Sequence, residues 1–476
     1  MFTSQLYSQS QIPQDLTENL EENEQGDAKL FKSKFTNKFV YDTTTKEWYK
    51  FTGPFWERDI NDSIILAIGD HIAADYIQEG ARQRIAGNAA KEKECIRRAS
   101  TLRSRKRVMD AIAWAKPMMS LPKSWDSAPL LLPCANGVVD LQNGSLRQGQ
   151  PDEYLKLHAP TKWSGLSYPA PNWEKFISEL VNGDKEMIAF LQRLLGYSIS
   201  GLSNEKVMPI LYGENGNNGK TTLLETIKSV LGTELTKKES ASVLMEAKFS
   251  GGEKPSDFIV SLQGKRIVWA NESKDGAKLD IGLLKELAGG DTISGRGVYA
   301  KHGIQFRPSH VVFLVTNRLP QLNVDDDAAW NRIFPIEFAV SFVDNPTSSN
   351  EKLINRKLPE LLTKEASGIL AWMVRGCIDY QQNGLQPPAS ILKWRQEYRK
   401  SEDKLEEFIA ECLNVSDPRS KTSSKIIYQN YRTWAKDNGL DPMSQSIMGK
   451  RLKKKNFVSH SGNKGIIYDG VSIKPI

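Results

Sequence analysis

The chain has 476 residues, of which 39% are hydrophobic and 25% charged, with a formal net charge of +7 and an isoelectric point near 8.9. This composition is typical of a globular protein, the length predicts about three domains, and no apolar run reaches the roughly 18 residues of a membrane span. The N-terminal segment does not resemble a signal peptide and the four cysteines have no paired spacing, so we expect a cytoplasmic protein without a zinc site or a disulfide framework.

The sequence of the first third of the chain indicates a tail followed by a mixed α+β domain. Residues 1–28 are rich in Gln, Ser, Asn and Glu and predict a disordered tail. In the predicted N-terminal domain, residues 29–165, the alternation at 38–57 indicates a hairpin and the periodicity at 62–116 indicates helices. Residues 130–146 indicate two short strands around an Asn-Gly turn.

A basic run lies within the predicted helices of this domain. Either a solvent-exposed charged helix face or a nucleic-acid contact would explain it, and the sequence does not choose between them. Its eight basic residues are Lys91, Lys93, Arg97, Arg98, Arg103, Arg105, Lys106 and Arg107.

The predicted central domain spans residues 166–345, after a linker rich in Pro, Gly and Ser at 160–171. A helical pair at 173–200 leads into it. Four short apolar runs then alternate with helices, which predicts an α/β fold with a parallel sheet. These runs are residues 209–212, 267–270, 311–315 and 334–338.

The segment 210–225, Ile-Leu-Tyr-Gly-Glu-Asn-Gly-Asn-Asn-Gly-Lys-Thr-Thr-Leu-Leu-Glu, predicts a strand, a Gly/Asn-rich loop and a helix. Such a loop turns backbone N–H groups inward beside a helix N-terminus, which makes an anion site, although an ordinary turn is the alternative. We expect Lys220 to reach the β- and γ-phosphates of ATP and the Thr221 hydroxyl to hold Mg²⁺. Five residues separate Gly213 from Gly219, where the standard pattern has four. The predicted nucleotide-binding residues are Gly213, Gly216, Asn218, Gly219, Lys220, Thr221 and Thr222.

Three further residues are predicted to be catalytic. Glu272 ends a buried strand, where it could order Mg²⁺ through water and accept a proton from the attacking water, and Asn317 ends another, where it could hold that water. Arg332 is predicted to act as an arginine finger in a neighbouring subunit's site, which requires a ring or stack of protomers. A surface arginine paired with the aspartates at 325–327 is the alternative.

Two segments are predicted to bind DNA. Residues 298–306 alternate around Lys301-His302-Gly303, which indicates a hairpin with a basic tip that could hold a phosphate backbone, or else an ordinary turn. After a helical segment at 346–415, residues 416–476 have the pattern of a winged helix; a packing domain with a solvated basic helix is the alternative. The candidate DNA-binding residues are Lys301, His302, Lys450, Arg451, Lys453 and Lys454.

These motifs occur in a characteristic order. Together they resemble superfamily 3 helicases, and within them the poxvirus and phage/plasmid primase-helicase group, over about residues 30–476. The elements that carry the resemblance are Lys220-Thr221 with its loop, Trp269-Ala-Asn-Glu272, Lys285, Gly290-Asp291, Arg296, Thr316-Asn317, Arg332, Asn136–Leu141, Trp48, Trp56, Gly368–Trp372 and Gly384-Leu385.

The resemblance implies a P-loop, AAA+-like ATPase core in a hexameric ring. Such a ring would translocate 3′ to 5′ on single-stranded DNA and unwind forked DNA during replication of a virus, phage or other mobile element, in the host cytoplasm. Asn271 and Asn331 depart from the family pattern, which leaves Glu272 and Arg332 alone in their roles. Because no polymerase site is evident before residue 165, we expect a separate primase or polymerase partner. An ATPase that remodels proteins or packages DNA, and a replication initiator whose nucleotide site controls assembly, remain alternatives.

Overall fold

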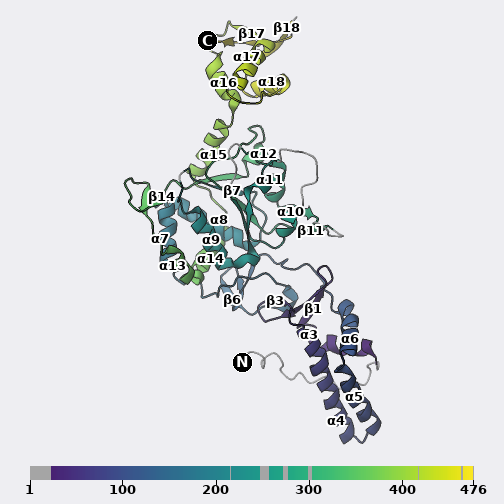
Figure 1. Cartoon of the computed structure of the whole chain (residues 1–476). Helices are drawn as coiled ribbons and strands as arrows, with labels where there is room; N and C mark the ends of the chain where they lie inside the picture. Colours follow the sequence, from purple (N-terminus) through teal and green to yellow (C-terminus); the bar gives the residue numbers. More distant parts are fainter. Residues whose placement is uncertain are drawn as a thin grey trace.

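The computed structural model describes residues 23–214, 216–246, 257–271, 277–297, 303–415, 417–462 and 465–474. Figure 1 shows three units along an elongated molecule: helices α3–α6 at one end, a sheet with its helices in the middle, and a small C-terminal unit at the other end. We call residues 23–128 the N-terminal unit, 129–403 the central unit and 404–474 the C-terminal unit. Within the described residues, no helix is long and apolar enough to cross a bilayer.

The N-terminal unit is a helical cluster whose order begins earlier than we predicted. Its first helix starts at Glu24, because the Asn23 side chain accepts a hydrogen bond from Gly26 N at 2.9 Å and caps the helix. Residues 24–28 therefore do not belong to the predicted tail. The helices are α2 (Glu24–Phe35), α3 (Ser63–Leu66), the π-helix η1 (Ala67–Ile72), α4 (Ala73–Ile85), α5 (Ala89–Leu102) and α6 (Arg105–Met118).

Two small antiparallel sheets join this unit to the central one. Each has a third strand that the sequence did not indicate, so the predicted hairpins at 38–57 and 130–146 are incomplete. The second sheet packs into the same core as the central helices, although we expected it in the N-terminal domain. The strands are β1 (Phe39–Asp42), β2 (Glu47–Phe51) and β3 (Trp56–Arg58), then β4 (Leu131–Cys134), β5 (Gly137–Asp140) and β6 (Ser145–Arg147), followed by the turn η2 (Pro151–Glu153).

The central unit contains a five-stranded parallel sheet with the strand order β13-β7-β12-β9-β8. Four of its strands lie where the apolar runs predicted them. The fifth, β8, has the sequence Thr-Lys-Lys-Glu-Ser and is polar because it is an edge strand. The strands are β7 (Met208–Tyr212), β8 (Thr236–Ser240), β9 (Ile267–Asn271), β12 (Val311–Thr316) and β13 (Ile333–Glu337).

Helices cover both faces of this sheet, and successive strand residues enter opposite cores. On β9, for example, Ile267 and Trp269 belong to one core while Val268 and Ala270 belong to the other. The first core contains α7 (Pro171–Leu180), α8 (Lys185–Ser200), α9 (Lys220–Leu235), α13 (Leu358–Lys364) and α14 (Ala366–Asn383). The second contains η3 (Ala241–Leu244), α10 (Asp257–Ser261), α11 (Ile281–Leu287) and α12 (Asp327–Trp330).

Two strand pairs lie outside the main sheet. The predicted hairpin before β12 is formed by β10 (Ile293–Gly295) and β11 (Ile304–Phe306), which are antiparallel. We had predicted that the first strand begins at residue 298, but β10 lies several residues earlier. The predicted tip at Lys301 and His302 lies outside the described residues. Strands β14 (Ser341–Val343) and β15 (Glu351–Leu353) are parallel, so the segment predicted to be helical from residue 346 becomes helical only at Leu358.

The C-terminal unit follows α15 (Ala389–Ser401), which leads into it from the central unit (Figure 1). Three helices and an antiparallel ribbon surround one small core that includes Phe408, Tyr431 and Leu452. The elements are α16 (Lys404–Cys412), β16 (Leu413–Asn414), β17 (Lys421–Ser423), α17 (Ser424–Asp437), α18 (Gln445–Lys454), β18 (Ser459–Gly462), β19 (Gly465–Asp469) and β20 (Ser472–Ile473). The sequence had predicted three helices followed by two strands within residues 416–476, whereas the first helix lies before residue 416 and two short strands, β16 and β17, separate it from the second helix.

Candidate functional site

The glycine-rich loop lies at the carboxyl edge of the parallel sheet, between β7 and α9. Gly219 has φ +78° and is the residue before the helix, so it offers no side chain to accept hydrogen bonds from the first N–H groups of α9. A Cβ on Gly213 would lie 2.8 Å from the carbonyl oxygen of Phe338, and one on Gly219 would lie 2.8 Å from Leu180. Glycine is required at both positions, and the helix N-terminus remains open to an anion.

Lys220 is the first residue of α9 and is buried, with 8% of its surface exposed. Its Nζ donates hydrogen bonds to three oxygens: Asn218 Oδ1 at 2.9 Å, Asn317 Oδ1 at 3.0 Å and the Gly213 carbonyl at 3.2 Å. These acceptors are neutral, so no negative charge compensates the ammonium for the hydration that it loses on burial. Burial therefore lowers the pKa of Lys220 to about 8. A buried ammonium in this setting gains stability from any anion placed beside it.

Asn317 follows β12 and Lys220 follows the loop after β7, and these two strands are neighbours in the sheet. Parallel strands end at the same edge, which is why the two predicted residues meet. The sequence had assigned them separate contacts with the nucleotide. The structure brings them into direct contact.

Asn218 has a second role that the sequence did not indicate. Its Nδ2 donates to the carbonyl oxygens of Phe338 and Val340, both at 2.9 Å, which ties the loop to the segment after β13. The Asn217 carbonyl accepts from Phe342 N at 3.0 Å and strengthens the same connection. Because three of these groups are backbone carbonyls, no residue type in the sequence could have revealed the anchor.

The remaining predicted nucleotide-site residues surround the open side of the loop. Thr221 is exposed, Thr222 is half-buried, and a Cβ on Gly216 would meet nothing within 4 Å. Asn271 ends β9, and its Oδ1 is buried without a hydrogen-bond partner. This oxygen lies at the same carboxyl edge of the sheet as the glycine-rich loop, two strands away from it, and oxygen is the ligand type that a hydrated Mg²⁺ ion prefers. Glu272, the next residue, lies outside the described residues.

A cavity of about 350 Å³ lies beside the loop. Two of its lining residues contact the loop. Leu180 lies next to Gly219, and the Val340 carbonyl accepts the hydrogen bond from Asn218. Trp394 from α15 also lines it, and the Trp394 ring packs against Tyr212 at the end of β7, with 5.1 Å between centroids. The lining is mixed: Trp394 and aliphatic side chains alternate with polar ones, including the carboxylates of Asp184, Glu337 and Glu397.

Arg332 lies at the other edge of the same sheet. Its carbonyl oxygen accepts from the backbone N of Met208, the first residue of β7, whereas the loop follows the last residue of that strand. At about 3.3 Å per residue, five strand residues separate Arg332 from the loop by more than about 13 Å. The structure therefore does not bring Arg332 together with Lys220 and Asn317 in one protomer.

The aspartates before Arg332 are paired with other cations. Asp325 accepts from Arg451 Nε at 2.5 Å, Asp326 from Lys285 at 2.5 Å, and Asp327 from Arg399 at 2.5 Å. Arg332 itself donates to the Ala328 carbonyl at 2.7 Å, and its Nε is buried without a partner. The alternative that Arg332 pairs with these aspartates is wrong.

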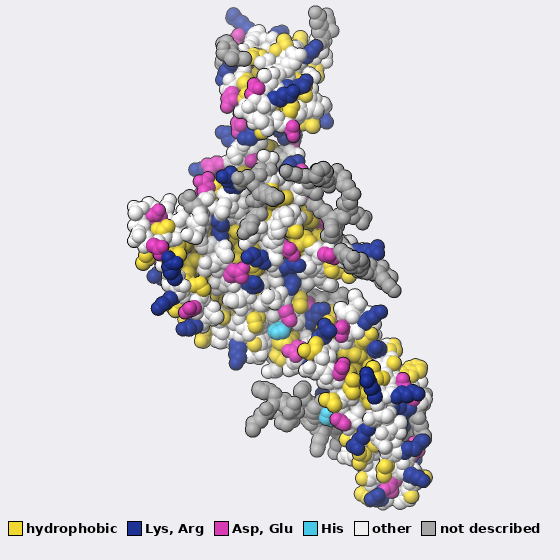
Figure 2. All heavy atoms as spheres, in the orientation of Figure 1, with side chains coloured by type: hydrophobic (Ala, Val, Ile, Leu, Met, Phe, Trp, Pro, Cys, Tyr) yellow, Lys and Arg dark blue, Asp and Glu magenta, His cyan; other side chains and the backbone are white. Residues whose placement is uncertain are grey.

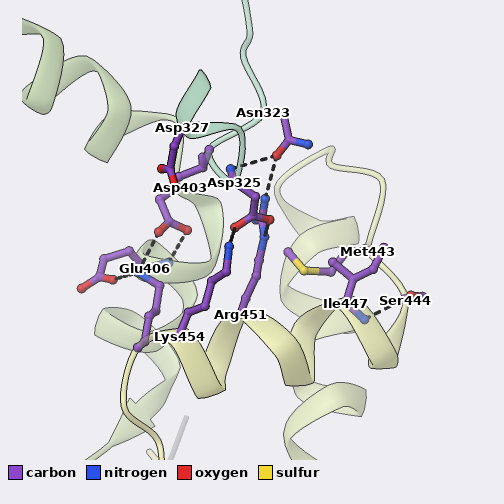
Figure 3. Close-up of polar contacts among 12 residues, drawn as sticks. Asn323, Asp325, Asp327, Asp403, Glu406, Met443, Ser444, Ile447, Arg451 and Lys454 are labelled. Atoms are coloured by element: carbon purple, nitrogen blue, oxygen red, sulfur yellow. Dashed lines mark hydrogen bonds and ion pairs between the residues drawn. The ribbon is translucent and has the colours of Figure 1, made fainter. Parts of the chain in front are cut away.

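The predicted recognition helix α18 contacts the central unit (Figure 3). Arg451 and Lys454 both extend from α18 toward Asp325, and Arg451 also donates to Asn323 Oδ1 at 3.3 Å. Of the four candidate DNA-binding residues on this helix, Arg451 is therefore half-buried in an intramolecular ion pair. Lys450, Lys453 and Lys454 are exposed.

The basic run of the N-terminal unit divides into internal and external residues. Arg98 and Arg107 pair with the fully buried Asp27 at 2.9 and 2.7 Å, so these two hold helices together. Most of the others are exposed. On the face drawn in Figure 2, Lys and Arg side chains of this unit are interspersed with Asp and Glu, as in a solvated surface.

Two family models match the chain. One, described as "D5 N terminal like", matches residues 28–182, and the other, "Family of unknown function (DUF5906)", matches residues 211–332. The first of these ranges covers most of the N-terminal unit with β4–β6 and α7, and the second runs from the end of β7 and the glycine-rich loop to Arg332, directly before β13.

Named relatives of the chain come from large DNA viruses. It is 26% identical to "Putative helicase L207/L206" of Acanthamoeba polyphaga mimivirus, over 94% of this chain and 48% of that protein. It is 22% identical to "Putative primase C962R" of African swine fever virus, over 74% of this chain and 38% of that protein. The chain thus spans half or less of the length of these relatives. Among solved structures, the NrS-1 C-terminal region (305–718) aligns with 94% of the chain at 11% identity and a TM-score of 0.48.

Proposed function

We propose that this chain, which belongs to the D5-like family of viral primase-helicases, is the ATP-driven helicase motor of a viral replication protein. The relatives carry the names of helicases and primases, which favours an enzyme that acts on DNA. The observation that carries the finer proposal is the contact of 3.0 Å between Lys220 Nζ and Asn317 Oδ1 at the mouth of the glycine-rich loop. Two polar side chains that meet at the mouth of this loop can both contact one ligand bound there.

In the proposed mechanism, the N–H groups at the start of α9 and the Lys220 ammonium hold the phosphates of ATP. Lys220 exchanges its three neutral acceptors for phosphate oxygens, which restores a full counter-charge to a buried cation. Asn317, released from Lys220, can then orient the attacking water. Mg²⁺, when bound, neutralises phosphate charge, and Thr221, Asn271 and Glu272 are the residues we assign to it.

Arg332 completes the site of a neighbouring subunit in this proposal. Its position at the opposite edge of the sheet and its lack of an acidic partner support a role outside its own protomer. A guanidinium that meets the γ-phosphate of the next subunit stabilises the charge of the transition state. This requires a ring of identical chains, for which a hexamer is the arrangement we propose.

DNA contacts are proposed for two segments. The hairpin of β10 and β11 precedes β12, and Asn317 directly follows β12, so a change at the nucleotide can reach the hairpin through this strand. We assign Lys301 and His302 to the phosphate backbone of single-stranded DNA. The order of helices and ribbon in the C-terminal unit supports a winged-helix-like module in which Lys450 and Lys453 face duplex DNA.

The first test is ATP-dependent unwinding of forked DNA by the purified chain. Lys220→Ala should abolish ATP hydrolysis and unwinding, whereas Lys301→Ala should retain hydrolysis and lose unwinding. Lys228→Ala, on the same helix and paired only with Glu225 near the surface, is the matched control and should behave as the wild type. Hydrolysis without strand separation on either tail polarity would favour a remodelling ATPase or an initiator instead.

A second test addresses the shared site. Lys220→Ala and Arg332→Ala proteins should each be inactive, and their mixture should recover part of the ATPase activity, because some interfaces then combine an intact Lys220 with an intact Arg332. A mixture of Lys220→Ala with the double variant has no intact Lys220 and should remain inactive. If the first mixture is as inactive as its components, Arg332 does not act across an interface.

A further inference from the structure

A buried arginine lies at the edge of the sheet opposite the glycine-rich loop. Arg266 directly precedes β9, at the amino edge of the sheet, and only 4% of its surface is exposed. Its Nε has no hydrogen-bond partner, and within the described residues no carboxylate approaches its guanidinium closely enough to form an ion pair. Burial lowers the pKa of Arg266, and the charge of Asp126 opposes that shift. A buried guanidinium without an ion pair is costly, so its surroundings need an explanation.

The guanidinium is held in place by the shape of the chain around it. Gly201, which ends α8 with φ +75°, lies so near that a Cβ there would be 1.1 Å from Nη1 of Arg266. The backbone of Arg266 is fixed as well, because its N donates to Leu235 O at 2.8 Å and its carbonyl accepts from Val311 N at 3.0 Å. The arginine therefore occupies a built position at the wall of a cavity.

That cavity has a volume of about 590 Å³ and lies where the N-terminal unit meets the central unit. It is lined by Trp125 and Asp126 from one side, and by Arg266 and the end of the β11 hairpin strand, Phe306-Arg307, from the other. Its size is within the range of about 300–1,000 Å³ that small-ligand sites occupy. All of its lining residues are described by the structure.

The wall of the cavity is cationic. Three of its residues, Lys156, Arg266 and Arg307, are basic, and Asp126 is its acidic one. The Asp126 carboxylate already accepts hydrogen bonds from the backbone N of Lys156 and of Leu157, at 2.8 and 3.0 Å, and burial raises its pKa. Further hydrogen-bonding groups come from Ser203, Asn204, Gln263 and Gln305.

We propose that this cavity is a second phosphate-binding site, in which Arg266 holds the phosphate of a nucleotide unit, either a free nucleotide or a link of a DNA strand. A phosphate accepts the bidentate hydrogen bonds that a guanidinium offers and supplies the missing counter-charge. Lys156 and Arg307 also line the cavity and add to the attraction. The site does not depend on the phosphate loop, since the two lie at opposite edges of the sheet.

The test uses the full chain carrying Lys220→Ala, so that binding at the phosphate loop is removed. Binding of ADP is measured by calorimetry and binding of a fluorescein-labelled dT₁₂ by anisotropy, which separates the two sources of phosphate. One of them should bind, and adding Arg266→Gln should weaken that binding about tenfold or more, as expected for a charge-assisted hydrogen bond. Arg307→Ala should weaken it by a smaller factor.

Arg356→Ala is the control, because Arg356 is an exposed arginine that pairs with Asp344 away from the cavity; it should have no effect. Thermal unfolding guards against a folding defect: Arg266→Gln should not lower the melting temperature of the ligand-free chain, because it removes a buried charge without a partner. The proposal is overturned if neither probe binds in a manner that depends on Arg266. It is also overturned if Arg266→Gln changes the oligomeric state and leaves phosphate binding intact, because Arg266 would then contact another subunit.

Discussion

The buried position of Lys220 predicts an unusual pH dependence of nucleotide binding. Its pKa of about 8 in the ligand-free protein means that Lys220 is protonated in most molecules at pH 7. At pH 9.5 only about 3% of such a group is protonated, so a ligand that requires the ammonium should bind about 30-fold more weakly than at pH 7. Phosphate oxygens next to Lys220 raise its pKa, and nucleotide binding above pH 8 should therefore take up one proton.

Folding stability should respond to the same group with the opposite sign. The pKa of Lys220 is lower in the folded chain than in the unfolded chain, so the unfolded chain binds more protons between about pH 8 and 10.5, and the ligand-free protein gains stability as the pH rises through that window. At pH 7 the burial of the charge costs up to about 3 kcal/mol. Lys220→Met should therefore raise the melting temperature while it abolishes nucleotide binding.

The assay is titration of a fluorescent ADP analogue from pH 7 to 9.5, with calorimetry in two buffers of different ionisation enthalpy to count protons. Lys220→Arg is the matched control, because arginine stays charged over this range and any binding it retains should not change with pH. A constant dissociation constant for the wild type, or binding without proton uptake, would refute the assignment of a perturbed ammonium to the phosphate loop.

Three further outcomes follow from buried or paired charges. Asp27→Asn should lower the unfolding free energy of the N-terminal unit by about 3–5 kcal/mol, because it removes the buried carboxylate that Arg98 and Arg107 share. Glu24→Gln, at a half-exposed pair with Arg107, should cost less than about 1 kcal/mol, and chemical denaturation measures both. His310 is buried and its pKa is lowered to about 4, so the unfolded chain binds more protons than the folded chain between pH 6.5 and 4. The unfolding free energy should therefore fall by about 3 kcal/mol as the pH is lowered through that window. In His310→Phe, urea titrations should not show this dependence. Asp325→Asn should release Arg451 and strengthen binding of forked DNA a few-fold at low salt but not at high salt, whereas Asp344→Asn, at an exposed pair, should not; anisotropy measures both.

Much of the central unit could be predicted because short stretches of its sequence determine where its strands lie. Short apolar runs predicted four of the five strands, and the parallel arrangement of the sheet then brings Lys220 and Asn317 to one edge. The edge strand β8 was missed because an edge strand is not required to be apolar. Arg266 and its cavity were missed because the segments that form the cavity are far apart in the sequence, and nothing about a single arginine before a strand indicates that it will be buried.

The acidic loop before Arg332 shows how distant parts of the chain determine the state of one residue. Three aspartates precede Arg332 by five to seven residues, and any of them could have neutralised it, as the sequence allowed. Each is instead held by a cation from another element: Asp326 by Lys285 on α11, Asp327 by Arg399 on α15, and Asp325 by Arg451 on α18. Figure 3 shows the last of these pairs. Arg332 is left with one backbone carbonyl for its five donors. The contact between the C-terminal unit and Asp325 thus helps to keep Arg332 available to an acceptor outside its own protomer, and a chain that loses this contact should lose part of its ATPase activity even though the phosphate loop is intact.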